Sequence, residues 1–382
     1  MADGRARASR ARTRVGYAAL FGIVGAFVIG VVMMGFVWTA AASTPQNLPV
    51  GISGPADRVE ALEDALAEQD PSPFELIAVD SREDAIEQIE DRTLYGAILL
   101  DEPEVLTATA AGPAAGQALN AVATQLQAQI SEASHNALVE KVQQLGAALA
   151  SGGAPSAPGQ GAPQQKAPSE AMPSAVPHVT VTDVVPLADT DPTGSGFTAA
   201  SFPLTLGGML GGILLSLLIV GTVRRLVGLL VLGVVAGPLA ALILQTWFGI
   251  LQGDWLVNAA ALGLMMTATA AFIIGMNAVF GQIGIGIGAV ITVLIANPLA
   301  SAAVPWQFLP EPWGAIGQFF VPGAGSNLIR SLSYFPEAPT ALHWTVLAGW
   351  AVLGVVLALI GHFRDQADMR VPGNQFETVH AA

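Results

Sequence analysis

The sequence predicts a polytopic α-helical membrane protein, with six transmembrane helices and an inserted extracytoplasmic α/β domain that carries a long helix. Three observations indicate this fold class. The 382 residues are 52% hydrophobic and only 12% charged, with a mean hydropathy of +0.56, which is too apolar for a soluble protein of this length. Arginines cluster before the first apolar run. A long acidic segment then separates that run from five others.

Six apolar windows are long enough to cross a bilayer core, which takes about 20 helical residues. They cover residues 15–42, 203–223, 226–246, 258–280, 283–304 and 343–362. The last five windows would form a five-helix membrane domain over residues 200–363. The first window has a second interpretation as a cleaved signal peptide, which would leave five spans. It is longer than the roughly 7–15 apolar residues of a signal peptide, so an uncleaved anchor is favoured.

The positions of the arginines set the expected orientation, because Lys and Arg beside a span stay on the cytoplasmic side. The basic arm of residues 1–14, the pair Arg224 and Arg225, and the tail of residues 364–382 all fall on one side if the chain crosses six times. Both termini are then cytoplasmic and residues 43–199 lie outside. Two lysines against thirteen arginines, with abundant Ala and Gly, suggest a bacterial cell membrane.

Residues 43–199 are expected to form a solvated acidic domain. They hold 22 acidic and five basic residues, a net charge of −17 that repels nucleic acid and anionic head groups. Strand-like runs alternate with helical ones at the start of this segment. The expected strands are residues 48–52, 74–79, 95–100, 105–110 and, after the long helix, 178–187. Pro55 opens the first helix, and Ser81 caps the second, with Asp84 three residues further on.

Residues 113–150 are predicted to form one long helix, rich in Ala and Gln, with apolar residues at helical spacing. At 1.5 Å per residue it would reach roughly 50 Å, more than a small sheet needs. Two interpretations stay open. Either its apolar stripe packs on a second copy of the chain, or the helix folds back on its own domain after a break near residues 131–136. Residues 151–177 have almost no large apolar side chain, which predicts a disordered linker.

The sequence carries no constellation of residues for catalysis. It has no cysteine, neither lysine follows a Gly-rich phosphate-binding turn, and no zinc-protease or serine-hydrolase motif is present. The five histidines are scattered along the chain. We therefore expect no catalytic, cofactor-binding or metal site, and we do not expect an enzyme. Any ATP hydrolysis would be carried out by a separate subunit.

Small residues spaced by four recur in the apolar windows, and such pairs let transmembrane helices approach closely. The candidate positions for helix packing or gating are Gly207, Gly208, Gly211, Gly212, Gly284 and Gly288. Close packing is one interpretation, and a sliding contact that changes conformation is the other. The windows contain no Asp, Glu, Lys or Arg, which argues against coupling to ions.

Residues 305–342 are expected to form an amphipathic hairpin at the outer interface, because aromatic residues alternate there with proline and glycine. Its candidate functional residues are Trp306, Trp313, Pro322 and Arg330. Ser326 is predicted to cap the helix that contains Arg330. The hairpin serves either as an aromatic anchor or as a gate at the outer mouth of the membrane domain.

Several motifs resemble those of the YhgE/Pip family and of the related type-II ABC exporter permeases with a large extracytoplasmic domain. They are DSREDA at residues 80–85, LYGAILL at 94–100, DVVPL at 183–187, FVPGAGSNLIR at 320–330 and YF at 334–335. The resemblance covers nearly the whole chain. It implies a homodimeric, permease-like protein that forms the transmembrane subunit of an exporter for amphiphilic, peptide or lipid cargo, with a possible separate ABC ATPase.

Under that resemblance, Arg224 and Arg225 are the candidate cytoplasmic coupling residues for the ATPase. The turn that holds them is short, which leaves little for an ATPase to contact. The alternative function is a non-transporting cell-surface receptor or a secretion-assembly scaffold. In either case the expected partners include the lipid bilayer and exclude nucleic acid.

Overall fold

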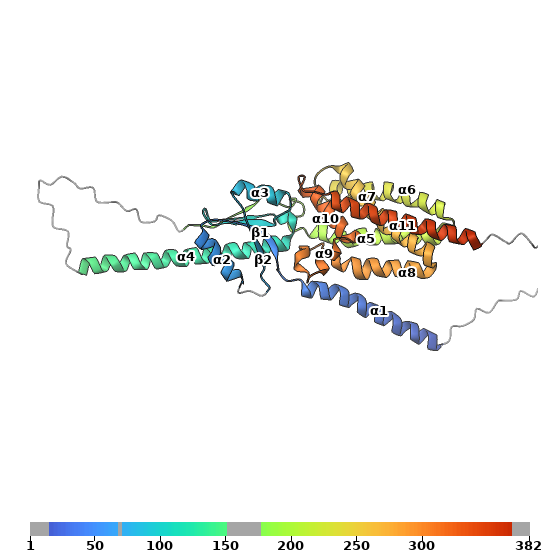
Figure 1. Cartoon of the computed structure of the whole chain (residues 1–382), viewed down its shortest axis with the longest axis horizontal. Coiled ribbons are helices and arrows are strands. Elements are labelled where there is room, and N and C mark those ends of the chain that lie inside the picture. The colour runs from blue at the N-terminus through green and yellow to red at the C-terminus, as the bar shows by residue number, and fades with distance from the viewer. Residues whose placement is uncertain (1–14, 68–70, 151–176, 369–382) are drawn as a thin grey trace, which may run out of the picture.

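The computed structural model describes residues 15–67, 71–150 and 177–368. Two units lie end to end, a bundle of helices and a domain built on a β-sheet (Figure 1). We call them the bundle and the sheet domain. The long helix α4 projects from the sheet domain on the side away from the bundle (Figure 1). Residues 151–176 of the expected linker, the basic arm and the C-terminal tail beyond Asp368 lie outside the described residues.

The sheet domain contains five strands in the order β2-β1-β3-β4-β5. Strand β1 pairs in parallel with β2 and β3, β3 pairs antiparallel with β4, and β4 pairs in parallel with β5. The strands are β1 (Leu48–Ser53), β2 (Phe74–Ala78), β3 (Gly96–Leu99), β4 (Glu104–Thr107) and β5 (Thr180–Asp183). The helical elements are α2 (Ala56–Ala67), α3 (Arg82–Glu90), the 3-10 turn η1 (Thr109–Ala111) and α4 (Pro113–Ala150).

Local signals in the sequence explain how helix α3 begins. Ser81 Oγ accepts the backbone N–H of Asp84 at 3.1 Å, as predicted. The Asp84 carboxylate in turn accepts the N–H of Asp80 at 3.0 Å, one residue before the cap. Ala85 and Ile89 then point into the domain core, where both are fully buried. The helix is therefore fixed at its start by caps and along its length by its apolar face.

Strand β1 and helix α4 form the centre of the sheet-domain core. Leu48 and Val50 of β1 are fully buried, as expected for a strand with a parallel neighbour on each side. Helix α4 covers the sheet closely at Gly96. A Cβ atom added to Gly96 would lie 2.4 Å from the carbonyl oxygen of Leu106 and 2.4 Å from Leu119 Cδ1, so only glycine fits at this position.

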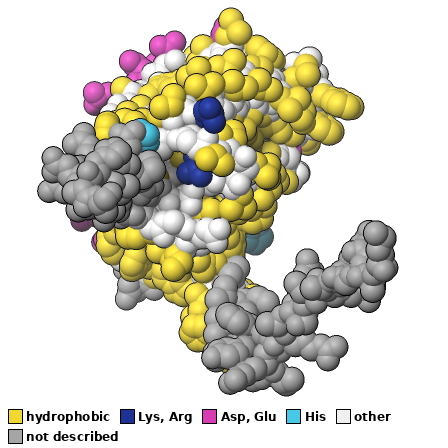
Figure 2. Space-filling view, turned by 90° about the vertical axis from the view of Figure 1, so that its right-hand side faces the viewer, with side chains coloured by type: hydrophobic (Ala, Val, Ile, Leu, Met, Phe, Trp, Pro, Cys, Tyr) yellow, Lys and Arg dark blue, Asp and Glu magenta, His cyan; other side chains and the backbone are white. Residues whose placement is uncertain are grey.

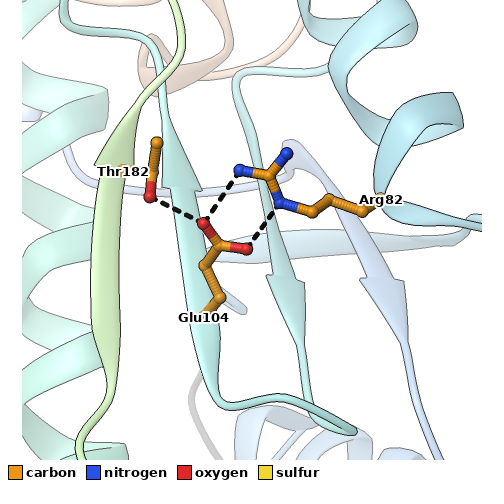
Figure 3. Close-up of polar contacts among 3 residues, drawn as sticks. All are labelled: Arg82, Glu104 and Thr182. Carbon is orange, nitrogen blue, oxygen red and sulfur yellow. Dashed lines mark hydrogen bonds and ion pairs between the residues drawn. The ribbon is translucent and has the colours of Figure 1, made fainter.

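The carboxylate of Glu104 joins three elements of the sheet domain (Figure 3). It accepts hydrogen bonds from Arg82 Nε at 2.7 Å and Nη2 at 3.1 Å, and from Thr182 Oγ1 at 2.6 Å. The hydrogen bond from Arg82 lowers the pKa of Glu104, and the bond from Thr182 acts in the same direction. Edge strand β5 is thus fastened to β4 and to the start of α3.

Helix α4 is continuous over its 38 residues. Its first half packs on the sheet through Leu119 and Ala123, which are buried. Its second half exposes apolar side chains, among them Leu138 at 38% and Val142 at 69%. The interpretation in which the helix breaks near residues 131–136 and folds back is therefore wrong. No Pro or Gly occurs between Gly116 and Gly146, so nothing interrupts the hydrogen-bond ladder at residues 131–136.

The bundle contains four helices that are long and apolar enough to cross a membrane, among the residues that the structure describes. They are Ser195–Leu218, Thr222–Trp247, Trp255–Phe280 and Ala341–Phe363. In element terms these are α5 (Ser195–Leu218), α6 (Thr222–Ala241) with the π-helical η2 (Leu242–Trp247), α7 (Trp255–Phe280) and most of α11 (Ala341–Asp368). They confirm that the chain has the makeup of a membrane protein.

The remaining elements of the bundle are shorter or lie to one side. The chain enters through α1 (Val15–Ala42), which diverges from the other helices toward its N-terminal end (Figure 1). After α7 come α8 (Gln282–Val290), the π-helical η3 (Ile291–Ala296) and the 3-10 turns η4 (Pro298–Ala300) and η5 (Trp306–Phe308). Two further helices, α9 (Trp313–Gly317) and α10 (Val321–Tyr334), precede α11.

Two expected spans differ from the observed helices. Helix α5 begins at Ser195, well before Pro203, because the buried Asp191 carboxylate accepts the N–H groups of Gly196 and Phe197 at 3.0 Å each and so caps the helix start. The window expected at residues 283–304 is helical only to Ala300. Its apolar helix Gln282–Ala296 is shorter than the other four.

Helix α7 is the centre of the bundle. In its apolar window 83% of residues are buried, against 17–28% for the other three long helices, which identifies α7 as the core and the others as its cover. Glycines on the covering helices make this packing possible. A Cβ at Gly212 would lie 2.8 Å from Ala270 O, and one at Gly237 would lie 2.3 Å from Ala259 O.

The six glycines singled out in the sequence all lie next to a neighbouring helix. Gly208 and Gly212 of α5 face the backbone of α7, and Gly207 faces the side chain of Met266 in α7. Gly211 faces Leu232 of α6. Gly284 and Gly288 of α8 lie against the last turns of α7. We did not expect a helix-packing role for Gly237, although Gly233 and Gly237 also have the spacing of four.

Candidate functional site at the junction of bundle and sheet domain

Helix α10 lies buried where the bundle meets the sheet domain. It begins at Val321, with Pro322 in its first turn, where the missing N–H of proline has no cost. Ser326 lies further along the helix and donates its hydroxyl to Pro322 O at 2.8 Å. The prediction that Ser326 caps this helix is therefore wrong, because Pro322 starts the helix a turn earlier. Most side chains of α10 are buried, so it is an internal element of the junction.

Arg330 of α10 connects three segments of the chain. Its guanidinium donates to Ala111 O of the sheet domain at 2.5 Å and to Ala302 O of the bundle at 2.8 Å. It also lies 5.0 Å from the ring centre of Phe197 at the start of α5. The residue is only 7% exposed. Burial, and then the charge of Arg92, lower the pKa of Arg330 to about 10, so it remains charged at neutral pH.

Arg92 makes the reciprocal contact from the sheet domain to α10. It donates to Asn327 O at 3.2 Å, to Asn327 Oδ1 at 2.9 Å and to Ser331 Oγ at 2.7 Å. Its guanidinium lies 5.3 Å from the ring centre of Phe335. Burial lowers the pKa of Arg92. Sequence reasoning missed this residue because an Asp-Arg pair after a helix resembles an ordinary exposed turn.

The two arginines at the junction have no acidic partner among the described residues. Every hydrogen bond of Arg92 and Arg330 goes to a carbonyl, an amide or a hydroxyl. The buried carboxylate of Asp191 is occupied by the N-terminus of α5 and makes no ion pair with either arginine. The junction therefore carries the buried guanidinium of Arg330 and the partly buried guanidinium of Arg92. Both are hydrogen-bonded but not neutralised by a described carboxylate, which is a costly arrangement for a buried charge.

A cleft of about 430 Å³ opens beside this junction, between α1 and the rest of the bundle. Its walls come from α1, from the first turns of α5, from the loop after η3 and from α10. The lining residues are Phe36, Thr39, Ala40, Ser43, Thr198, Ser201, Phe202, Asn297, Pro298, Ala300, Ser301, Ala302, Ala303, Val304, Leu309, Pro322 and Ser326. The lining is largely apolar, with several hydroxyl groups and one amide but no charged side chain.

Aromatic contacts hold α1 at the rim of this cleft. The rings of Phe36 and Phe202 meet edge to face with 6.0 Å between their centres. Those of Trp38 and Trp313 meet in the same way at 6.4 Å. The main backbone neighbours of α1 are η3 and η4. The C-terminal part of α1 therefore contacts the bundle along the cleft.

The candidate residues of the outer hairpin are divided between two places. Pro322 lines the cleft, and Trp313 lies at its rim against Trp38. Trp306 instead lines a separate cavity of about 370 Å³ between η5, α9 and the sheet domain, together with Glu75. Only part of the expected hairpin therefore belongs to the cleft.

Arg224 and Arg225 lie at the opposite end of the bundle, where basic side chains appear among hydrophobic ones (Figure 2). Arg225 donates to Ser216 O at 2.9 Å and Ile219 O at 2.8 Å and so closes the C-terminal end of α5. Arg224 is exposed. The connection between α5 and α6 consists of residues 219–221. Arg225 is engaged in holding the end of α5, so Arg224 is the arginine of this turn that can contact a partner.

Among the described residues, no group of three or more His, Asp or Glu side chains could hold a metal ion. Comparison with the models of known protein families, with curated proteins and with solved structures gives no match. The class of protein therefore follows from the fold itself. It is a mostly helical protein whose described residues include four helices long and apolar enough to cross a membrane, with a five-stranded sheet domain at one end of the bundle.

Proposed function

We propose that this protein is a permease-like membrane subunit of an exporter, and that its cargo is an amphiphile such as a lipid or an apolar peptide. The proposal includes six membrane spans in a bacterial cell membrane, with both termini in the cytoplasm and the sheet domain outside. The observation that carries it is the cleft between α1 and α5, which lies among helices with lipid-compatible surfaces.

The chemistry of the cleft suits an amphiphile better than an ion. Its walls are apolar, and its hydroxyl groups and Asn297 supply a few hydrogen-bonding positions that fix orientation. The four long helices carry no charged side chain in their described parts except Arg224 and Arg225 at one end. Ion-coupled transporters usually place an ionisable residue within their spans. An apolar route beside α1 fits a molecule that enters sideways from the bilayer.

The arrangement of α1 supports movement at this site. Helix α1 is tied to the bundle chiefly by Phe36, Trp38 and its contacts with η3 and η4. The π-helical segment η3 lies next to the cleft, and such segments often mark functional positions in helices. A swing of α1 away from the bundle would leave the core around α7 intact. The resemblance of the sequence to exporter permeases points to the same function.

An experiment with the full-length protein tests this function. The protein is purified in mild detergent with any ATPase that accompanies it and is reconstituted into vesicles that contain a fluorescent phospholipid. We expect transfer of the probe to an external acceptor, accelerated by ATP. If no ATPase accompanies the protein and transfer equals that of protein-free vesicles, the exporter assignment is wrong.

A second function, as a surface scaffold or receptor, is favoured by one observation. The second half of α4 extends beyond the sheet and exposes Leu138 and Val142, which is typical of a helix that meets a partner. A scaffold would keep its partner binding when the cleft is blocked, for example by Ala40→Trp. An exporter would lose cargo transfer with the same change, so this variant separates the two functions.

A further inference from the structure

Packing alone does not explain the buried Arg330 and the partly buried Arg92 at the junction. A buried cation without a carboxylate is costly, and hydrophobic residues of similar volume often serve a core as well. Arg330 and Arg92 also repel each other, since the charge of Arg92 disfavours that of Arg330. Their positive charge therefore has to be explained by something that the described residues do not supply.

The guanidinium of Arg330 lies directly behind the wall of the cleft. It donates to the carbonyl of Ala302, a lining residue, and it lies over the ring of Phe197, which precedes the lining residue Thr198. Ser326, one helical turn before Arg330, also lines the cleft. In a water-poor environment a charge acts over several ångströms, so the junction end of the cleft has a positive potential.

The cleft is thus apolar along its walls and electropositive at one end. We propose that it binds the head group of an anionic membrane amphiphile, such as a phospholipid with net negative charge, at the Arg330 end, with the acyl chains along α1 and α5. This inference rests on the proposed function, because it names the substrate class for the same cleft.

The charge distribution of the molecule favours a membrane-borne anion over a soluble one. The segment that forms the sheet domain has a strong excess of acidic residues, so it repels any anion, soluble or lipid-borne, that approaches from its side. A lipid reaches the cleft from the bilayer instead, past the exposed apolar surface of α1. A lipid head group and a soluble phosphate ester would present the same phosphate group to the site. The competition experiment below distinguishes these two ligands.

Lipid retention by the full-length protein tests the proposal directly. The protein is solubilised from vesicles of equal parts phosphatidylglycerol and phosphatidylcholine, washed extensively, and its tightly bound lipid is measured by mass spectrometry. We expect phosphatidylglycerol to be retained about tenfold over phosphatidylcholine, which corresponds to about 1.4 kcal/mol of attraction between the head group and the charge of Arg330 behind the wall. Equal retention of the two lipids would overturn the proposal.

Matched variants locate the effect. Arg330→Gln should remove the preference, and Arg330→Lys should keep part of it because the charge remains. Arg225→Gln is the control, since Arg225 also donates to two carbonyls but lies at the other end of the bundle. A preference that survives Arg330→Gln, or that is lost equally in Arg225→Gln, contradicts the assignment.

A second variant keeps the test decisive if Arg330→Gln does not fold. Ala40→Trp fills the cleft from α1 without touching Arg330, and it should abolish retention of phosphatidylglycerol. Val37→Trp is its control, because Val37 is exposed on the same helix but does not line the cleft. Retention by Ala40→Trp at the level of Val37→Trp would show that the lipid binds elsewhere.

A competition experiment with glycerol 1-phosphate distinguishes a membrane-borne anion from a soluble one. At millimolar concentration it should leave the bound phosphatidylglycerol in place, because the acyl chains contribute most of the affinity. Displacement of the lipid by glycerol 1-phosphate alone would mean that the site binds a soluble phosphate ester. That result would overturn the proposal of a membrane-borne ligand. Lipid retention requires neither ATP nor transfer. A protein that binds the lipid but moves none would contradict only the proposed function.

Discussion

Arg92 of the sheet domain donates two hydrogen bonds to Asn327 of α10, one to its backbone carbonyl at 3.2 Å and one to its side-chain oxygen at 2.9 Å. The two residues are 235 positions apart in the chain. In the opposite direction, Arg330 of α10 donates to Ala111 O of the sheet domain. These reciprocal bonds make α10 the element through which the sheet domain and the wall of the cleft are mechanically joined.

The first prediction concerns this joint. Replacing Arg92 with Gln should leave the oxygen atoms of Asn327 and Ser331 without their donor. Loss of a donor to buried acceptors lowers the free energy of unfolding by about 1–3 kcal/mol. We expect faster amide hydrogen exchange in α10 in the full-length protein. Arg58→Gln is the control, because Arg58 donates to Leu100 O within the sheet domain. Unchanged exchange in α10 would mean that Arg92 does not hold the joint.

The second prediction is a pH dependence in the sheet domain. Arg82 lowers the pKa of Glu104 in the folded state, so the ion pair stabilises the fold above the pKa of an unfolded Glu, about 4.3. This stabilisation is lost as the pH falls through the lower, folded pKa. Thermal unfolding of wild type and Glu104→Gln should therefore differ by a constant amount at neutral pH and converge in acid. A difference that grows as the pH falls would contradict this assignment.

The third prediction concerns the packing around α7. Gly212→Leu places side-chain atoms against the backbone of Ala270, where even a Cβ would be 2.8 Å from the carbonyl oxygen. Such overpacking should destabilise the bundle by about 1–3 kcal/mol or more. Gly286→Leu is the control, because a Cβ at Gly286 meets nothing within 4 Å and leucine favours helix more than glycine. Equal melting temperatures of the two variants in detergent would show that α5 does not pack as described.

The fourth prediction concerns a second copy of the chain. The apolar stripe of α4 is exposed at Leu138 and Val142, so a homodimer through α4 should bring two copies of Val142 together. Because the chain has no cysteine, Val142→Cys gives an unambiguous cross-link. Glu140→Cys, on the opposite side of the helix, should cross-link far less. Equal cross-linking at both positions, or none at Val142, would argue against this dimer.

The sequence was informative wherever structure depends on neighbouring residues. The start of α3 at Ser81, the extent of α4 and the apolar helices all follow from caps, periodicity and hydropathy. Two expected helix starts were wrong because a second local signal lies a few residues upstream. Asp191 caps α5, so the helix begins at Ser195 and not at the expected Pro203. Pro322 starts α10 upstream of the expected cap Ser326.

The candidate site was predicted only in part, because some of its contacts join residues that are far apart in the chain. Arg330, Pro322 and Trp313 were identified by type and context, and they do lie at or next to the cleft. Arg92 was not identified, because its partner Asn327 is close only in the folded chain. The wall contributed by Phe36 and Ala40 was also missed, since an apolar span gives no indication of which face meets a cleft.

The most direct measurement for the central claim uses a reducible cross-link across the cleft. The ring centres of Phe36 and Phe202 are 6.0 Å apart at its rim, and the chain has no other cysteine to react in the double variant Phe36→Cys with Phe202→Cys. In vesicles, joining the two cysteines with a short bismaleimide that contains a disulfide should stop amphiphile transfer, and reduction of that disulfide should restore it, while each single variant treated in the same way stays active. Undiminished transfer by the fully cross-linked double variant would contradict the claim that cargo moves between α1 and α5.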